Sequence, residues 1–124
     1  MNVPGFLARQ FYVAGSLQDT PDGFSLGARN PMGEGHITGI GRLAVDGRPI
    51  DPAAVTALRD GDPTVFQAGE VSRERPITVH KGDTVTLRVL GHHLESGEHR
   101  LEVELIERDL GALRLAITDR VRGG

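Results

Sequence analysis

Three histidines and two glutamates lie close together late in the chain and are the first candidates for chemistry. They are His92, His93, Glu95, Glu98 and His99. Imidazole and carboxylate groups are common ligands of transition metals, so this segment has to be considered as a metal site. The expected geometry argues against one, because His99 falls on the same side of its strand as Leu101, whereas the other two histidines lie in the preceding loop. We predict a solvated loop without a metal, and a metal or sugar contact is the alternative.

Residues 23–27 match the pattern G-x-S-x-G, which surrounds the nucleophilic serine of many hydrolases. The motif works there because a sharp turn from strand to helix exposes the serine oxygen above an α/β sheet. In this chain Ser25 lies inside a run of alternating apolar and polar residues, and Pro31 follows soon after it instead of a helix. We predict that Ser25 lies on the polar face of a strand and is not catalytic.

Carboxylates and glycines form two further patterns that resemble known sites. Glu102, Glu104 and Glu107 suggest the paired acids of a glycosidase, but the first two point the same way on a strand face that is otherwise polar. The glycines between residues 33 and 41 do not complete a nucleotide-binding G-x-G-x-x-G, because Thr38 interrupts it. A charged solvated face and a flexible turn account for these patterns, so no catalytic residue is predicted.

One segment, between Arg29 and His36, remains as a candidate binding loop. Proline and glycine shape it, and its side chains combine a positive charge with amide, thioether and imidazole groups. Loops held by a rigid scaffold carry a large share of binding residues. An ordinary hairpin loop is the alternative. The residues predicted to lie close to a partner or a substrate are Arg29, Asn30, Pro31, Met32 and His36.

Strands must position this loop, because apolar and polar residues alternate with a period of two through most of the chain. One apolar and one polar face are typical of antiparallel sheets that pack on one side. Turn-forming pairs such as Asp46-Gly47 and Gly82-Asp83 separate the alternating runs. The expected strands cover residues 7–13, 24–29, 37–45, 64–67, 77–80, 84–89, 100–105 and 113–118.

A single helix start is expected at Asp51, an N-cap aspartate that precedes Pro52 at the first helical position. The helical pattern ends by Gly61, which limits the helix to about two or three turns. Residues 120–124 are predicted to form a frayed tail. Many short strands separated by turns predict an all-β fold in a single domain covering residues 1–124. We expect an antiparallel β-sandwich, immunoglobulin-like or jelly-roll-like, with one short helix.

Composition limits the class of protein. The 124 residues fit one domain, and the absence of cysteine excludes disulfides and thiolate metal sites. A net charge of −3 lacks the positive field that nucleic acids require. No apolar run is long enough for a membrane span, and the first residues do not resemble a secretory signal. We therefore expect a cytoplasmic protein without nucleic-acid or membrane partners.

A set of short strand and turn motifs runs through the chain, namely Gly23-Phe24-Ser25-Leu26, Arg29-Asn30-Pro31, Gly35, Ile40, Leu43-Ala44-Val45-Asp46-Gly47 and Gly97-Glu98-His99. These motifs are similar to those of the small β subunits of bacterial C-glycoside deglycosidases. The similarity spans residues 6–50 and 82–118 and consists of strand and turn patterns. Met32 and Gly33 depart from it, because aromatic residues often follow the R-x-P turn in that family.

This resemblance implies that the chain is a non-catalytic subunit of a carbohydrate-active complex. Its partner would be a TIM-barrel α subunit that carries the catalytic base and a divalent metal such as Mn²⁺, while this chain holds no cofactor. The complex would cleave the carbon–carbon bond between a sugar and an aromatic aglycone, a lyase-type deglycosylation, and this chain would bind and brace the barrel. Two alternatives stay open. One is a stand-alone sandwich that binds a sugar or another small polar molecule, and the other is a minor enzyme whose site forms between copies of a homo-oligomer.

Overall fold

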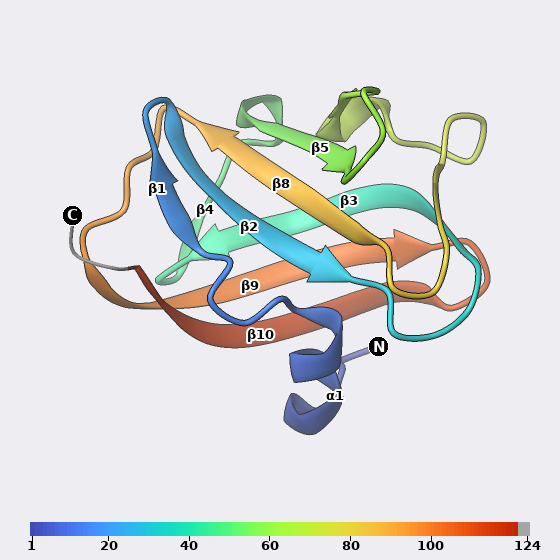
Figure 1. The fold of residues 1–124 in the computed structure, drawn as a ribbon, viewed down its shortest axis with the longest axis horizontal. Helices are drawn as coiled ribbons and strands as arrows, with labels where there is room; N and C mark the ends of the chain where they lie inside the picture. The colour runs from blue at the N-terminus through green and yellow to red at the C-terminus, as the bar shows by residue number, and fades with distance from the viewer. Residues whose placement is uncertain (122–124) are drawn as a thin grey trace.

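Two antiparallel sheets packed face to face form the fold in the computed structural model, which describes residues 1–121 (Figure 1). One sheet has the strand order β1-β2-β8-β5-β6, and the other has the order β10-β9-β3-β4, with β7 also paired to β3. The predicted all-β sandwich with a short helix is confirmed. The elements are α1 (Gly5–Phe11), β1 (Gln18–Thr20), β2 (Gly23–Arg29), β3 (Gly35–Val45), β4 (Arg48–Pro49), η1 (Pro52–Ala54), β5 (Val55–Arg59), β6 (Phe66–Gln67), η2 (Ala68–Glu70), β7 (Ile77–Val79), β8 (Thr84–Leu90), β9 (Gly97–Glu107) and β10 (Gly111–Val121).

The core lies between the two sheets and is built by the alternating strands. Phe24 and Leu26 of β2 and Leu87 of β8 are at most 1% exposed. They belong to one apolar cluster with Leu101 and Val103 of β9. Each large side chain buried in this way stabilises the fold by about 1.5–3 kcal/mol. The cluster therefore forms a rigid body that carries the loops at both ends.

The strand predicted over residues 7–13 is wrong, because Gly5–Phe11 form the helix α1. Ala8 is fully buried, and the helix packs beside β10 (Figure 1). The segment has the spacing of one helix face, with apolar side chains in neighbouring pairs four residues apart. The apolar residues with this spacing are Leu7, Ala8, Phe11 and Tyr12.

The helix predicted from Asp51 is a single 3₁₀ turn, η1, which is followed directly by β5. The predicted cap is present, since the Ala53 N–H donates a hydrogen bond of 2.9 Å to the Asp51 carboxylate. The chain then becomes extended because Val55 and Ala57 enter the core while β5 pairs with β8. Pairing within the sheet thus outweighs the local helix signal.

The N-terminal segment packs along the outer edge of β10. Asn2 forms a parallel bridge to Arg114, and the Tyr12 hydroxyl donates a hydrogen bond to the Asp119 carboxylate. Unpaired strand edges are sites of unwanted association, so this segment protects part of a long edge.

The end of β10 corrects the predicted frayed tail. Arg120 and Val121 belong to this strand, and Val121 lies opposite Gly97 in the ladder with β9. Residues 122–124, which complete the predicted tail, lie outside the described residues. Within residues 1–121 no helix has the length and apolar character needed to cross a membrane.

Antiparallel pairing gathers the β2–β3, β7–β8 and β9–β10 loops at one end of the sandwich. Arg29 at the end of β2 lies opposite Thr84 at the start of β8, and the start of β3 lies opposite the end of β9. The β1–β2 turn and the β8–β9 loop lie at the opposite end, where Gly23 is paired with Leu90. Loops distant in the sequence therefore meet in two separate groups.

Candidate functional site

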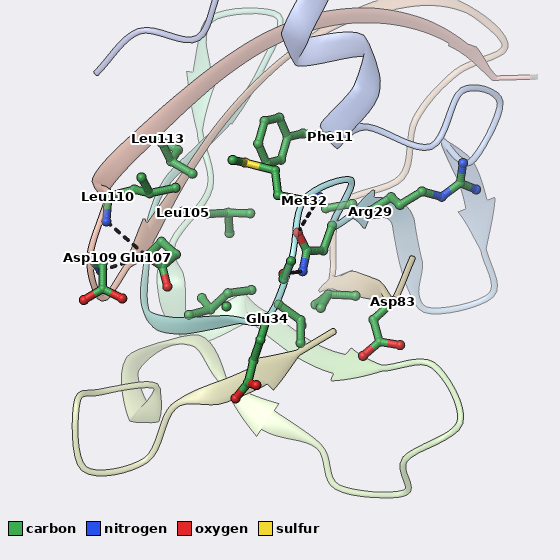
Figure 2. Close-up of a pocket in the computed structure, with 17 residues that line it drawn as sticks. Phe11, Arg29, Met32, Glu34, Asp83, Leu105, Glu107, Asp109, Leu110 and Leu113 are labelled. Atoms are coloured by element: carbon green, nitrogen blue, oxygen red, sulfur yellow. Dashed lines mark hydrogen bonds between the residues drawn. The ribbon is translucent and has the colours of Figure 1, made fainter. Parts of the chain in front are cut away.

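An apolar cavity of about 290 Å³ opens where the β2–β3, β7–β8 and β9–β10 loops meet (Figure 2). We call this the cavity end of the sandwich. Phe11, at the end of α1, lines the cavity and is half-buried. Ligand and partner sites are commonly concave and apolar, whereas protein cores leave few voids of this size. The buried wall residues are Ile37, Val79, Val85, Leu105 and Leu113.

Met32 reaches the cavity from a β2–β3 loop that polar contacts hold in place. Met32 is 52% exposed, and Figure 2 shows its side chain directed toward the ring of Phe11. The Asn30 side chain fixes the loop, because its oxygen accepts from the Met32 N–H at 3.1 Å and its amide donates to the Gly33 carbonyl at 2.6 Å. The Asn30 backbone is paired in turn with Gly82 and Asp83. Met32 is thus exposed on an ordered loop.

Leu110 occupies the corresponding place in the β9–β10 loop and is 50% exposed. Glu107, the last residue of β9, holds this loop through one carboxylate oxygen. That oxygen accepts hydrogen bonds from the N–H groups of Asp109 at 2.7 Å and Leu110 at 3.0 Å. Leu110, like Met32, is therefore an exposed apolar side chain on a loop fixed by a polar one.

Glu107 also connects the two loops. Its second carboxylate oxygen accepts a hydrogen bond of 2.9 Å from the backbone N–H of His36, in the strand that follows the Met32 loop. Partial burial opposes the charge on Glu107. The N–H donors of His36, Asp109 and Leu110 outweigh it and hold the pKa of Glu107 below its usual range. An ionised Glu107 thus sets the relative position of the two exposed apolar residues.

Carboxylates border the apolar centre of the cavity. Figure 2 shows the side chains of Glu34, Asp83 and Asp109 outside the group of apolar side chains. Arg29 also lines the cavity, but its guanidinium points away from it (Figure 2). The mouth therefore combines an apolar centre with a negative border.

The structure brings three of the five predicted loop residues into the lining, namely Arg29, Asn30 and Met32. Pro31 belongs to the same loop but lies outside the lining. His36 lies in β3, where its Nδ1 is 3.1 Å from the hydroxyl oxygen of Thr78 in β7. The predicted loop therefore borders the cavity, and its role in binding stays a prediction.

Sequence reasoning missed three residues of this end. Phe11 falls in the wrongly predicted strand, and Glu107 belongs to the predicted solvated charged face, but both line the cavity. Of the three, Leu110 could have been recognised from the sequence. It is a large apolar residue in a polar turn between Asp109 and Gly111, and the turn itself does not need such a residue. Its meaning appears only when the turn is placed beside the cavity.

The late histidines do not converge on one point. The His99 ring lies between the Glu95 carbonyl oxygen and the Asp46 carboxylate, each 2.7 Å away. The Glu95 carbonyl and then the Asp46 carboxylate hold the pKa of His99 above its usual value. His93 instead contacts the Asp19 carboxylate at 3.0 Å. Among the described residues, no group of three or more His, Asp or Glu side chains is arranged to hold a metal ion.

The other candidate residues have structural partners. Ser25 is only 5% exposed rather than on an open polar face, because β2 is an inner strand between β1 and β8. Its hydroxyl accepts a hydrogen bond of 3.3 Å from the Gln18 amide, which cannot act as a base. Two carboxylates of the predicted charged face form ion pairs. These are Glu102 with Arg42 at 3.7 Å and Glu104 with Arg114 at 2.7 Å.

A comparison with protein families gives a match over most of the chain. The model of the family described as hydroxymethylglutaryl-CoA reductase, N-terminal domain, matches residues 7–122. The chain belongs to this family. The match begins within α1 and includes the ten strands that the structure describes in residues 1–121. The hydroxymethylglutaryl-CoA reductase N-terminal domain family therefore covers both sheets and the cavity. A comparison with curated proteins found no match.

The resemblance to C-glycoside deglycosidase β subunits is wrong, because the matching family is the hydroxymethylglutaryl-CoA reductase N-terminal domain. The motifs behind the resemblance describe backbone geometry. Asp46 and Gly47 of the V-D-G motif have φ of 52° and 80°, the left-handed values that a tight hairpin turn requires. A Cβ added at Gly23 would stand 1.9 Å from the Val89 carbonyl oxygen. Unrelated sandwiches need the same residue types at such positions.

Proposed function

We propose that this chain is a non-catalytic domain that binds a larger partner protein through its cavity end. The observation that carries the proposal is the pair of exposed apolar side chains, Met32 and Leu110, on hydrogen-bonded loops at the mouth of an apolar cavity. Apolar surface surrounded by polar groups is typical of protein interaction sites. Loops that are already ordered reduce the entropy lost on binding, which favours a docking role.

The family supports an accessory role. Its description is that of an N-terminal domain of hydroxymethylglutaryl-CoA reductase, which is one part of a larger enzyme. The groups in this chain that resemble catalytic residues are engaged elsewhere, since Glu107 binds backbone N–H groups and His99 binds Asp46. We therefore propose that catalysis belongs to the partner.

The rejected resemblance was the basis for a TIM-barrel partner, its Mn²⁺ and cleavage of C-glycosidic bonds. We do not extend these expectations to this chain. The partner-binding role has separate support from the cavity end, and it does not depend on the chemistry of the partner.

A small polar ligand, such as a sugar, is the second candidate function, and the size of the cavity favours it. About 290 Å³ is close to the lower limit of ligand pockets, which is about 300 Å³. Such a ligand needs several polar groups directed at it. The nearby polar groups of Asn30 and Glu107 are already bound to the loop backbone. Apolar contact with a partner protein accordingly suits the cavity better.

The test is recovery of the tagged full chain from its native host, with single variants compared in parallel. Met32→Asp and Leu110→Asp each place a charge at the cavity mouth. Leu90→Asp is the matched control, because Leu90 is 51% exposed at the opposite end and Leu110 is 50% exposed. We expect the wild type and the control to retain one partner at a fixed ratio, measured from the mass of the intact complex, and the two mouth variants to lose it.

Two results would contradict the proposal. In one, the partner remains bound to both mouth variants as well as to the control. In the other, the wild-type chain is recovered alone. The second result would direct attention to ligand screening of the isolated chain.

A further inference from the structure

We infer that the partner element recognised at the cavity end is a basic segment that inserts one large apolar side chain into the cavity. This inference rests on the proposed docking function and specifies the chemistry of the partner. The cavity determines what is inserted, and its border determines the charge of the segment around the inserted group.

The size of the cavity selects a large apolar group. Its volume is about 290 Å³, whereas an apolar cavity of about 150 Å³ in a protein holds a benzene molecule. One aromatic ring or one long aliphatic side chain with its stem therefore fits. Leu105, Leu113 and Val85 present only hydrocarbon to the inserted group. A polar group placed there would lose hydrogen bonds to water and gain none from these three side chains.

The border of the cavity selects positive charge. Four carboxylates belong to the lining, and the guanidinium of Arg29 points away from it (Figure 2). Three basic neighbours offset this charge in part. The His36 ring is 3.5 Å from Glu34, the His80 ring is 3.4 Å from Asp83, and the exposed Arg108 is 3.4 Å from Asp109. The two histidines offset the charge only when they are protonated. The carboxylates are Glu34, Asp83, Glu107 and Asp109.

Two features allow the excess negative charge at the cavity border to favour a basic partner. Glu34 and Asp109 are exposed, so a partner segment can approach them directly. The chain as a whole has a net charge of −3, which also favours the approach of a basic segment. Complementary charge around an apolar contact mainly sets the rate of association and excludes partners of the wrong sign.

The test uses three blocked pentapeptides and the full chain labelled at its methyl groups. The peptides are Lys-Lys-Phe-Lys-Lys, Lys-Lys-Ala-Lys-Lys and Glu-Glu-Phe-Glu-Glu. At low salt we expect the basic aromatic peptide to shift the methyl resonances of Met32, Leu110 and Leu113 and to bind at least tenfold more tightly than the other two. Its advantage over the acidic peptide should shrink as salt is added.

Variants that remove carboxylates test whether the border of the cavity causes the preference for the basic peptide. The double variant Glu34→Gln with Asp109→Asn should reduce the preference for the basic aromatic peptide over the acidic one at least threefold. The matched control Glu95→Gln with Glu98→Gln removes two carboxylates from the β8–β9 side of the sandwich and should leave the preference unchanged. Equal effects of the two double variants would overturn the assignment of the border.

Three other outcomes would overturn the inference. They are equal binding of the basic and acidic aromatic peptides, equal binding of the alanine and phenylalanine peptides, and no methyl shift with any peptide at millimolar concentration. Concentration-dependent shifts of the same methyl groups without peptide would assign the cavity to a second copy of the chain. If Met32→Asp still removes the native partner in any of these cases, docking stands and only the basic segment is rejected.

Discussion

The two ends of the sandwich carry equally exposed leucines in different surroundings. Leu110 at the cavity end and Leu90 at the opposite end are 50% and 51% exposed. Leu110 borders an apolar cavity on a loop that Glu107 fixes. Leu90 is the last residue of β8, and the surface hollow at its end of the molecule mixes polar residues such as Asp19 and Arg120 with apolar ones. An exposed leucine therefore indicates a binding surface only when apolar surroundings and a fixed backbone accompany it.

Carboxylates hold loops at both ends, but their partners differ. At the cavity end Glu107 accepts hydrogen bonds from backbone N–H groups alone. At the opposite end Asp46 accepts from the Arg100 N–H and also contacts the ring of His99, and Asp19 likewise contacts His93. The β9–β10 loop at the cavity end thus depends on one ionised carboxylate. The contacts at the opposite end also involve protonatable rings, as does the contact of Asp83 with His80 in the β7–β8 loop.

Of the changes considered, Glu107→Gln should have the largest effect on the stability and partner affinity of the cavity end. The two carboxylate oxygens accept three N–H groups, and an amide offers only one oxygen, so at least one N–H group faces an NH₂ group. We expect the free energy of unfolding to fall by about 1–2 kcal/mol and the melting temperature to fall by several degrees. Partner affinity, measured by calorimetry, should fall more than tenfold.

Asp19→Asn is the matched control for Glu107→Gln, because Asp19 accepts the Leu94 N–H in the loop at the opposite end. It should lower the melting temperature less and leave partner affinity unchanged. If the two variants weakened partner binding equally, the distinction between the ends would be lost.

Asn30→Ala should have a smaller effect that is confined to binding. The change removes the side-chain contacts to the Met32 N–H and the Gly33 carbonyl in an exposed loop, while the backbone contacts of Asn30 remain. We expect a threefold to tenfold loss of partner affinity and a change in melting temperature of less than about 2 °C, because exposed hydrogen bonds contribute little to stability. Unchanged affinity would show that the order of the Met32 loop does not matter for docking.

Glu107 at the cavity end and His99 at the opposite end should respond to pH in opposite directions, and this is the smallest of the three effects. The pKa of Glu107 is held below its usual range, so its stabilisation is complete above the unfolded pKa and is lost as the pH falls through the folded pKa. The pKa of His99 is raised, so its stabilisation is complete below about pH 6.5 and is lost as the pH rises through the folded pKa.

Thermal unfolding of paired variants measures this response. The difference in melting temperature between wild type and Glu107→Gln should shrink from about pH 6 to about pH 3. The difference in melting temperature between wild type and His99→Gln should shrink as the pH rises from about 6 to about 8. A difference that stays constant over its range would refute the assigned hydrogen-bond partners.

The sandwich could be predicted from the sequence because each long strand buries one face. Alternation placed β2 and β8 within one residue of their observed bounds. The strands predicted for β9 and β10 are too short. The ladder between these two strands continues to the pair of Val121 and Gly97, beyond the alternating residues on which the prediction rested. Alternation failed for α1, where the helix spacing of Leu7 and Phe11 was overlooked, and for β5, where pairing with β8 overrides the cap at Asp51.

The candidate site was predictable only in part. Residue types identified the loop containing Asn30 and Met32, because proline, glycine and mixed polar groups mark a shaped loop. The role of Glu107 depends on a contact with His36, which lies 71 positions earlier in the chain. The cavity itself exists only because antiparallel pairing brings three loops to one end. Local patterns contain no information on such contacts.

Photo-crosslinking in the native host tests the central claim, that the cavity end is the docking surface, most directly. A photoreactive amino acid replaces Met32, Leu110 or Leu90, one at a time, in the tagged full chain. We predict that positions 32 and 110 crosslink to the same protein and that position 90 does not. Crosslinking of that protein from position 90, with none from positions 32 and 110, would contradict the account.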